Sequence, residues 1–216
     1  MKRINHISII GCGFVGNSIA VVMKERGISK IDVYDKFLPE KSSCESIDEL
    51  ARRSKIIFVC VPTPMNKDGS CNISIVESVL TELNKCCEGQ SVILKSTVPP
   101  GTTKTLQKKF KFLNLIFSPE FLTEKNALDD MRNQDRIILG GNRVGDVARL
   151  FEETFQGVPI FKTDSTTAEM VKYATNCFLM TKVLFFNEIW QMCQKLNMNY
   201  DLIPEMLSHD SRIGKS

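Results

Sequence analysis

The sequence has no long block of like charge. Its 28 Lys and Arg residues nearly balance its 25 Asp and Glu residues, which leaves a formal net charge of +3 at pH 7. Adjacent charges of one sign do not extend beyond pairs such as Arg52-Arg53 and Lys108-Lys109. A charge so small and so evenly spread gives no reason to expect a nucleic acid or a membrane surface as partner, and we expect neither.

Metal-binding and disulfide patterns are also missing. The chain has eight cysteines, but no two of them are spaced C-x-x-C, and its only histidines, His6 and His209, lie far apart. This spacing is not that of a zinc site, so we expect no metal. Several cysteines lie in apolar runs, where a free thiol behaves as a small hydrophobe. We therefore expect reduced thiols in a cytoplasmic protein.

A long hydrophobic run is absent as well. The basic start and the apolar stretch to Met23 could imitate a signal peptide, but three glycines and Asn17 interrupt that stretch. Its uncharged part is also shorter than the roughly 20 residues that span a bilayer. A strand, a turn and a helix fit this stretch better.

Short β-branched runs alternate with longer amphipathic segments along most of the chain. Helical periodicity is clear in Ile73–Cys87, and Ser46–Glu49 has the spacing of a capping box. Strands that alternate with helices predict an α/β fold, here a doubly wound Rossmann-type sheet that is mostly parallel. The expected strands are Ile4–Ile10, Lys30–Tyr34, Ile56–Val61, Ser91–Lys95, Leu113–Phe117, Arg136–Leu139 and Pro159–Phe161.

The alternation ends after about residue 163. Thr166–Glu169 has the spacing of a second capping box, and no Gly or Pro follows before Leu196, which predicts a helix of about 30 residues. Its bulky apolar residues exceed what one helical stripe can hold. We expect part of this helix to be buried against a partner subunit or another domain, or else across its own sheet. The expected domains are 1–163, Rossmann-like, and 164–216, the start of a helical domain.

A glycine-rich segment joins the first expected strand to the first helix. Gly11–Gly16 reads G-x-G-x-x-G in the strand–helix setting of a dinucleotide site, with a helix amino terminus that attracts phosphates. The first glycine permits a tight turn, the second lets a pyrophosphate approach, and the third lets helix and strand pack closely. Asp35, at the end of the second strand, can accept hydrogen bonds from ribose hydroxyls, and its charge repels a 2′-phosphate. The sequence predicts NAD binding over NADP, although Lys36 follows directly; a glycine-rich turn without a ligand is the alternative.

Three further segments follow expected strands: Val61–Pro64, Lys95–Thr103 and Ser118–Glu124. The carboxyl ends of parallel strands bind ligands in open α/β sheets, although each segment alone could be only a turn. On the long helix, Lys172 and Asn176 are four residues apart and share a face. An ammonium and an amide together can stabilise a developing alkoxide, while a solvated helix face is the alternative.

With these segments in this order, the sequence resembles the UDP-glucose/GDP-mannose dehydrogenases over essentially its whole length. The UDP-glucose branch is the most similar, because Arg136–Ile138 follows S-P-E-F-L, although GDP-mannose enzymes share P-E-F-L. The motifs that carry the resemblance are G-C-G-F-V-G, V-P-T-P, K-S-T-V-P-P-G-T-T, S-P-E-F-L-T-E, D-R-I-I-L-G, E-M-V-K-Y-A-T-N, F-N-E and Asp210–Gly214.

The resemblance implies an oxidoreductase that uses two NAD to oxidise the C6 alcohol of a nucleotide sugar, here UDP-glucose, to a carboxylate. It also implies that the long helix forms a homodimer and that Arg212 reaches substrate across the dimer interface. Lys172 and Asn176 match the pair that stabilises the C6 oxyanion, and Thr97 and Glu124 match cofactor-side and water-handling positions, with Glu124 a candidate base for hydrolysis. The implied cofactor-binding residues are Gly11, Gly13, Phe14, Val15, Gly16, Asp35, Lys36, Pro62, Thr63, Thr97 and Glu124. The implied substrate-binding residues are Glu120, Phe121, Leu122, Lys172, Asn176 and Arg212.

One departure from the family pattern concerns a cysteine. In the family, a G-G-x-C-x-P-K-D-type segment follows R-I-G, and its cysteine attacks the aldehyde intermediate. The present sequence ends at Ser216, and none of its cysteines lies in such a segment. Covalent catalysis needs a positioned nucleophile, so we expect that this polypeptide alone does not complete the second oxidation.

Two other functions fit part of the pattern. A β-hydroxyacid dehydrogenase also combines a Rossmann domain with a helix that carries Lys and Asn four apart, but Ser118–Leu122 and the short helical part argue against it. A non-catalytic, NAD-binding remnant that still dimerises is the second alternative.

Overall fold

The computed structural model describes residues 4–213. It divides into two compact units, the first ending at Lys172 and the second beginning at Tyr173. The division lies inside helix α7 (Ser165–Leu196), so the domain boundary that we predict at residue 163 stays a prediction.

The first unit is built on one seven-stranded sheet with the order β2-β1-β3-β4-β5-β6-β7. All neighbours are parallel except β5 and β6, which pair in an antiparallel manner through Phe117 and Gly140. The mostly parallel sheet is thus confirmed, and each expected strand is present within two residues of its predicted ends. The strands are β1 His6–Ile10, β2 Lys30–Tyr34, β3 Ile56–Val59, β4 Ser91–Leu94, β5 Asn114–Phe117, β6 Ile137–Gly140 and β7 Ile160–Thr163.

Successive residues of the central strands enter two different hydrophobic cores. In β3, Ile57 and Val59 belong to one core, while Ile56 and Phe58 belong to the other. This alternation follows from the two-residue period of a strand, and burial of both faces explains why these strands are continuous apolar runs.

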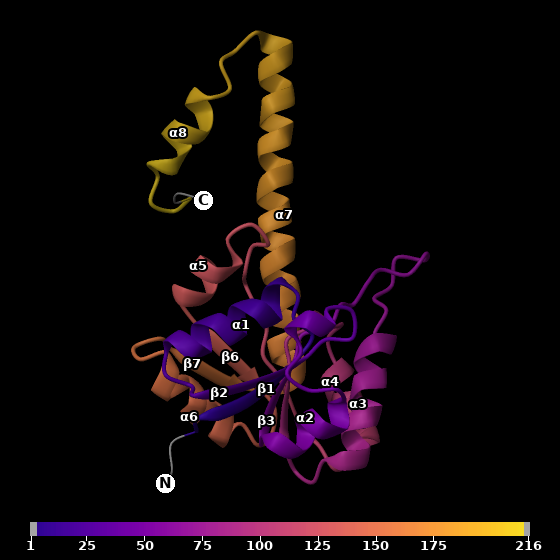
Figure 1. The fold of residues 1–216 in the computed structure, drawn as a ribbon. Helices are drawn as coiled ribbons and strands as arrows, with labels where there is room; N and C mark the ends of the chain where they lie inside the picture. The colour runs from indigo at the N-terminus through magenta and orange to yellow at the C-terminus, as the bar shows by residue number, and fades with distance from the viewer. Residues whose placement is uncertain (1–3, 214–216) are drawn as a thin grey trace. The chain divides into compact units, whose positions relative to one another are not determined.

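Helices cover both faces of the sheet (Figure 1). The first core contains side chains of α2, α3 and α4, and the second contains side chains of α1, α5 and α6. The helices are α1 Phe14–Glu25, α2 Ile47–Arg53, α3 Ser74–Cys86, α4 Thr102–Lys109, α5 Ala127–Arg132 and α6 Gly145–Thr154, with a short 3₁₀ turn η1 at Pro39–Lys41. The helix predicted for Ile73–Cys87 is confirmed as α3.

Only one of the two expected capping boxes forms at its helix start. Ser46 Oγ accepts the backbone N–H of Glu49 at 3.2 Å, as the spacing predicts for α2. The box predicted for Thr166–Glu169 is wrong. Helix α7 begins at Ser165, and the carboxylate of Asp164 accepts the N–H of Thr167 at 3.0 Å. Glu169 instead binds backbone N–H groups at the start of another helix, α4, where its carboxylate is buried.

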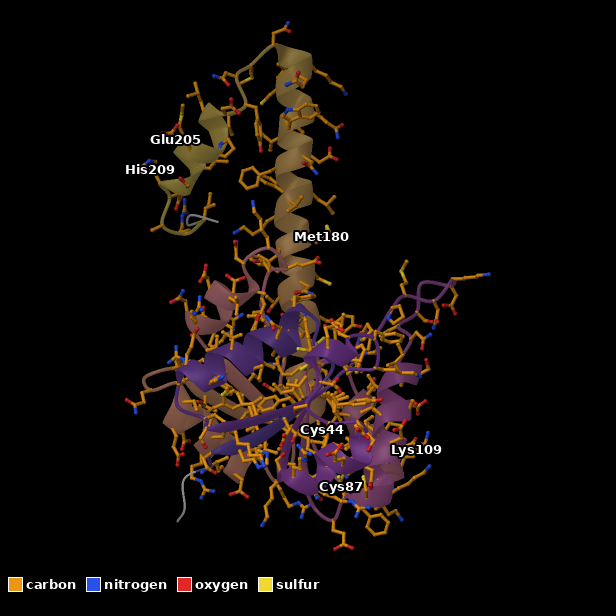
Figure 2. All side chains as sticks on the ribbon, viewed as in Figure 1. Cys44, Cys87, Lys109, Met180, Glu205 and His209 are labelled. Carbon is orange, nitrogen blue, oxygen red and sulfur yellow. The ribbon has the colours of Figure 1, made fainter. Side chains whose placement is uncertain are left out.

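The second unit consists of the remainder of α7 and helix α8 (Leu202–Ser208). The long helix is confirmed, with 32 residues in all. Large apolar side chains of its second part stand exposed; Met180, labelled in Figure 2, is 59% exposed and Phe178 is 64% exposed. Within residues 4–213, no helix combines the length and the apolar character needed to cross a bilayer.

Candidate cofactor and catalytic site

A cleft of about 390 Å³ lies at the carboxyl ends of β1 to β5. Strands β2 and β3 lie on opposite sides of β1, so the direction in which strands are added to the sheet reverses after β2. The cleft opens at this switch point. Ligands bind at such points in open α/β sheets. Nine predicted site residues line the cleft: Gly11, Gly13, Phe14, Val15, Asp35, Pro62, Thr63, Thr97 and Glu120.

The three glycines of the first turn have separate structural reasons. Gly11 has φ +90°, and a Cβ there would lie 2.7 Å from the carbonyl oxygen of Cys60. A Cβ on Gly16 would lie 1.9 Å from the carbonyl oxygen of Gly11, which explains the close contact of helix and strand. At Gly13 a Cβ would meet nothing within 4 Å, so this backbone is open to an approaching ligand. Since no side chain caps the start of α1, its amino terminus can receive a phosphate.

Asp35 follows β2 and is bonded to the glycine-rich turn. Its carboxylate accepts the N–H of Cys12 at 2.6 Å and the N–H groups of Phe37 and Leu38 at 2.8 and 3.0 Å. Burial alone would raise the pKa of Asp35, but these three donors and the nearby Lys41 outweigh it and lower the pKa below its usual value. Asp35 is therefore an ionised acceptor near neutral pH, as ribose hydroxyls require.

Side chain–backbone bonds tie the segment after β3 to the segment after β4. Ser96 Oγ donates to the carbonyl oxygen of Val61 at 2.6 Å, and Thr63 Oγ1 donates to that of Thr97 at 2.8 Å. Two walls of the cleft are thus held together independently of the sheet.

Lys172, on α7, binds Glu120, which lines the cleft. Its ammonium donates to the carbonyl oxygen of Glu120 at 2.6 Å and to Oε1 of the same residue at 2.9 Å. The two side chains are only 8% and 11% exposed. The ring of Phe121, next to Glu120, contacts both this ammonium and the guanidinium of Arg136, which lie 5.6 and 4.0 Å from the ring centre. Leu122 donates its N–H to Glu120 Oε2 at 2.8 Å, so the turn after β5 is well fixed.

Eight predicted site residues do not line the cleft: Lys172, Phe121 and Leu122, which lie around Glu120, and the five that follow. Gly16 packs behind it, and Lys36 lines a neighbouring cavity beside Asp35. Glu124 is exposed on the loop before α5. Asn176 and Arg212 belong to the second unit, where Asn176 is exposed and Arg212 pairs with Asp210 at 2.6 Å. Their assigned roles stay predictions. Within residues 4–213, no group of His, Cys, Asp and Glu could hold a metal ion.

Two groups at the cleft were not singled out from the sequence, Lys95 and Cys60. Lys95 Nζ donates to the carbonyl oxygen of Pro119 at 3.0 Å and lies 3.4 Å from Ser118 Oγ. Burial raises the pKa of Cys60 to about 12, so this thiol is neutral at pH 7 and a poor nucleophile. One sequence feature could have pointed to Lys95. It is a lysine at the end of an apolar strand, where burial is unfavourable for the charged ammonium.

Lys95 is expected to make stability depend on pH between about 8 and 10. Burial lowers its pKa to about 8 in the folded state, while an unfolded lysine titrates near 10.4. Between these values the unfolded chain binds more protons, so the free energy of unfolding rises with pH, by up to about 3 kcal/mol. Urea unfolding of the wild type and Lys95→Met from pH 7 to 10 would show a wild-type gain that the variant lacks. Parallel curves would contradict a buried, titrating Lys95.

The strand order also gives the cleft a direction. The strands lie in the spatial order β2, β1, β3, β4 and β5. In the same order, the groups that follow them are Asp35, the glycine turn, Pro62, Thr97 and Glu120. Four steps of about 4.8 Å separate the first strand from the last, roughly 19 Å in all. A dinucleotide that placed its ribose at Asp35 and its pyrophosphate at the glycine turn would therefore extend toward Thr97 and Glu120.

The chain is similar in sequence to a known protein family and to several of its members. Residues 38–157 match the NAD binding domain of the UDP-glucose/GDP-mannose dehydrogenase family, and residues 166–216 match its central domain. UDP-glucose 6-dehydrogenase of Campylobacter jejuni is 34% identical over 97% of this chain and 61% of its own length. UDP-glucose 6-dehydrogenase TuaD of Bacillus subtilis is 34% identical over 78% of this chain and 39% of its own length. The chain thus spans only part of these relatives.

Solved structures agree with the sequence matches. A UDP-glucose dehydrogenase from Pyrobaculum islandicum superposes with a TM-score of 0.88 at 27% identity, over 99% of this chain and 58% of that one. GDP-mannose dehydrogenase from Pseudomonas aeruginosa, at 23% identity and a TM-score of 0.84 over 97% of this chain and 58% of that one, shares the fold. One of the two matched domains is NAD-binding, as the glycine turn and Asp35 predict, and the chain belongs to the UDP-glucose/GDP-mannose dehydrogenase family.

Proposed function

We propose that this chain forms the cofactor-binding and first catalytic part of an enzyme that oxidises the C6 alcohol of a nucleotide sugar, with UDP-glucose as the substrate. The observation that carries the proposal is the ion pair of Lys172 with Glu120, because Glu120 lines the cleft and follows the strand farthest from Asp35. Oxidation of the alcohol removes the hydroxyl proton, which passes to water, and a hydride from C6. A cationic donor at this position would stabilise the negative charge that forms on the oxygen as the proton leaves.

The geometry of Lys172 suits that role. An ammonium has three N–H donors, and Glu120 accepts two of them, through its carbonyl and its carboxylate. The third remains for the C6 oxygen, and Glu120 fixes the direction in which it points. Bound NAD would supply the hydride acceptor. Asp35 would hold the adenosine ribose, the glycine turn and Phe14–Val15 would hold the pyrophosphate, and Pro62, Thr63 and Thr97 would line the nicotinamide side.

Further roles rest on the family resemblance. We propose that Asn176 supports the oxyanion with Lys172, that Glu124 handles water in the hydrolytic step, and that Phe121 and Leu122 contact the sugar nucleotide. Arg212 would bind substrate across a dimer interface, and Lys36 would lie beside the adenosine ribose.

The proposal is tested by absorbance at the NADH wavelength after the chain is mixed with NAD and UDP-glucose. A rise that depends on UDP-glucose and is lost in Lys172→Ala is the expected result for the first hydride transfer. Phe112→Ala, an exposed residue outside the cleft, is the matched control and is expected to keep wild-type activity. NAD binding without any rise would instead favour the second candidate, a cofactor-binding remnant.

We also propose that the chain forms a homodimer through α7. The support is the apolar surface of the second unit, where Val183, Leu184 and Phe185 are each more than half exposed. Exposed patches of this kind mark interaction sites. Light scattering is expected to give twice the chain mass for the wild type and the monomer mass for Leu184→Glu. Free cysteines within residues 4–213 suit a cytoplasmic location, which cell fractionation tests.

A further inference from the structure

Glu169 occupies an unusual position for a helical carboxylate. It lies in the second turn of α7 and is fully buried, yet no cation pairs with it among the described ion pairs of residues 4–213. Its Oε2 accepts the N–H of Gly101 at 2.5 Å and its Oε1 accepts the N–H of Thr103 at 2.7 Å. These donors begin helix α4, whose own N-cap residue, Gly101, has no side chain to satisfy them. The cap of α4 is therefore supplied by a residue more than sixty positions later in the chain.

Each partner of this contact leads to a different part of the proposed site. On the α4 side, the chain runs back from Gly101 to Thr97, which lines the cleft and is bonded to Thr63. On the α7 side, Lys172 lies three residues after Glu169, on the same helical face, and donates to Glu120. The carboxylate of Glu169 thus links the Thr97 wall to the lysine.

A second contact also fixes the first turns of α7. A Cβ on Gly140 would lie 2.5 Å from the Cβ of Ala168, so the first turns of α7 press closely on the end of β6. Steric contact at Ala168 limits how near α7 can come to the sheet, whereas the bonds of Glu169 limit how far it can slide or turn. Together they leave one register in which the ammonium of Lys172 meets Glu120.

We propose that Glu169 is a positioning residue, which sets the register of α7 on α4 and so holds Lys172 on Glu120 and Thr97 at the cleft wall as one coupled unit. The catalytic importance of Lys172 rests on the proposed function, whereas the position that Glu169 gives to Lys172 does not. Removing the carboxylate leaves the N–H groups of Gly101 and Thr103 without this acceptor, and the first turns of α7 lose two hydrogen bonds to the start of α4.

The test uses Glu169→Ala and Glu169→Gln, with Asp164→Ala as the matched control. Asp164 caps α7 itself, so its loss also weakens the start of the helix but leaves the bonds to α4 intact. Two quantities are measured: the rate at which acetic anhydride modifies Lys172, followed by mass spectrometry, and the affinity for NAD, measured by calorimetry. Neither requires turnover, so absence of sugar oxidation would refute the proposed function and leave this inference standing.

Glu169→Ala is expected to increase the modification rate of Lys172 and to weaken NAD binding, each by about 10-fold. Glu169→Gln keeps the shape and one acceptor, so it is expected to fold and to fall between the wild type and alanine. Asp164→Ala is expected to match the wild type in both readouts although its Tm is lower. The inference is wrong, and Glu169 is only a helix cap, if Glu169→Ala lowers the Tm but keeps the wild-type modification rate of Lys172 and the wild-type NAD affinity. If Glu169→Ala does not fold, the same outcome for Glu169→Gln decides against the inference.

Discussion

Gly16→Ala is expected to lower the free energy of unfolding by more than about 3 kcal/mol and to abolish NAD binding. The added Cβ would lie 1.9 Å from the carbonyl oxygen and 3.0 Å from the carbonyl carbon of Gly11. Both are backbone atoms of a turn that is itself bonded to β2 through the N–H of Gly11 and the carbonyl of Tyr34, at 2.9 Å. Neither Gly16 nor the Gly11 carbonyl can move without opening the contact between α1 and the sheet. Denaturant unfolding and NAD titration measure the two effects.

Gly13→Ala separates cofactor binding from folding in the same segment. A Cβ there would meet no protein atom within 4 Å, and the backbone has φ −68°, which any residue adopts. This variant is expected to keep the wild-type stability and to lose NAD affinity, because the methyl group occupies the space where a pyrophosphate approaches. Wild-type stability of Gly16→Ala, or equal behaviour of the two variants, would contradict this division of roles.

Lys172→Met is expected to lower the free energy of unfolding by about 3–5 kcal/mol, the usual cost of removing one partner of a buried ion pair. Lys172 and Glu120 are 8% and 11% exposed, so solvent cannot replace the lost partner. The carboxylate and the carbonyl of Glu120 would both lose their donor. Methionine keeps the length and the apolar stem of lysine, which limits the effect of packing.

The double variant Lys172→Met/Glu120→Gln tests the cause of that loss. A neutral amide can remain in the turn and still accept the N–H of Leu122, which Glu120 Oε2 binds at 2.8 Å. If the uncompensated carboxylate is responsible, the double variant recovers much of the stability that Lys172→Met loses, and a double-mutant cycle gives the coupling. Additive losses would show that the pair contributes through packing instead.

The elements predicted correctly from the sequence are those with a local cause. Gly11–Gly16 needs only its own turn and the adjoining strand and helix, and the buried strands are short apolar runs between turn residues. The long helix follows from the absence of Gly and Pro over 166–196. The antiparallel direction of β6 has no such local signal, because it depends on how the chain returns after α5.

The part of the site that the sequence did not predict depends on partners distant in the chain. The spacing Thr166–Glu169 predicts a local cap, but burial against α4 gives Glu169 two donors that lie 66 and 68 residues away. Lys95 stood within a recognised motif, yet its pKa depends on burial that only the packed sheet provides. The pairing of Lys172 with Glu120, across 52 residues, was likewise not visible from the helical face alone.

The strand order has a consequence for synthesis of the chain. Five of the six neighbouring pairs in the sheet join strands that are consecutive in the sequence. The exception is the pair of β1 and β3, which are separated in the sequence by β2. Apart from β3, which docks on β1, each new strand can therefore dock on the one made just before it, which keeps loop closure short and limits the time for which a strand edge stays unpaired. A nascent chain leaving the ribosome could add one strand after another and complete the sheet once β7 has emerged, before α7 is fully synthesised.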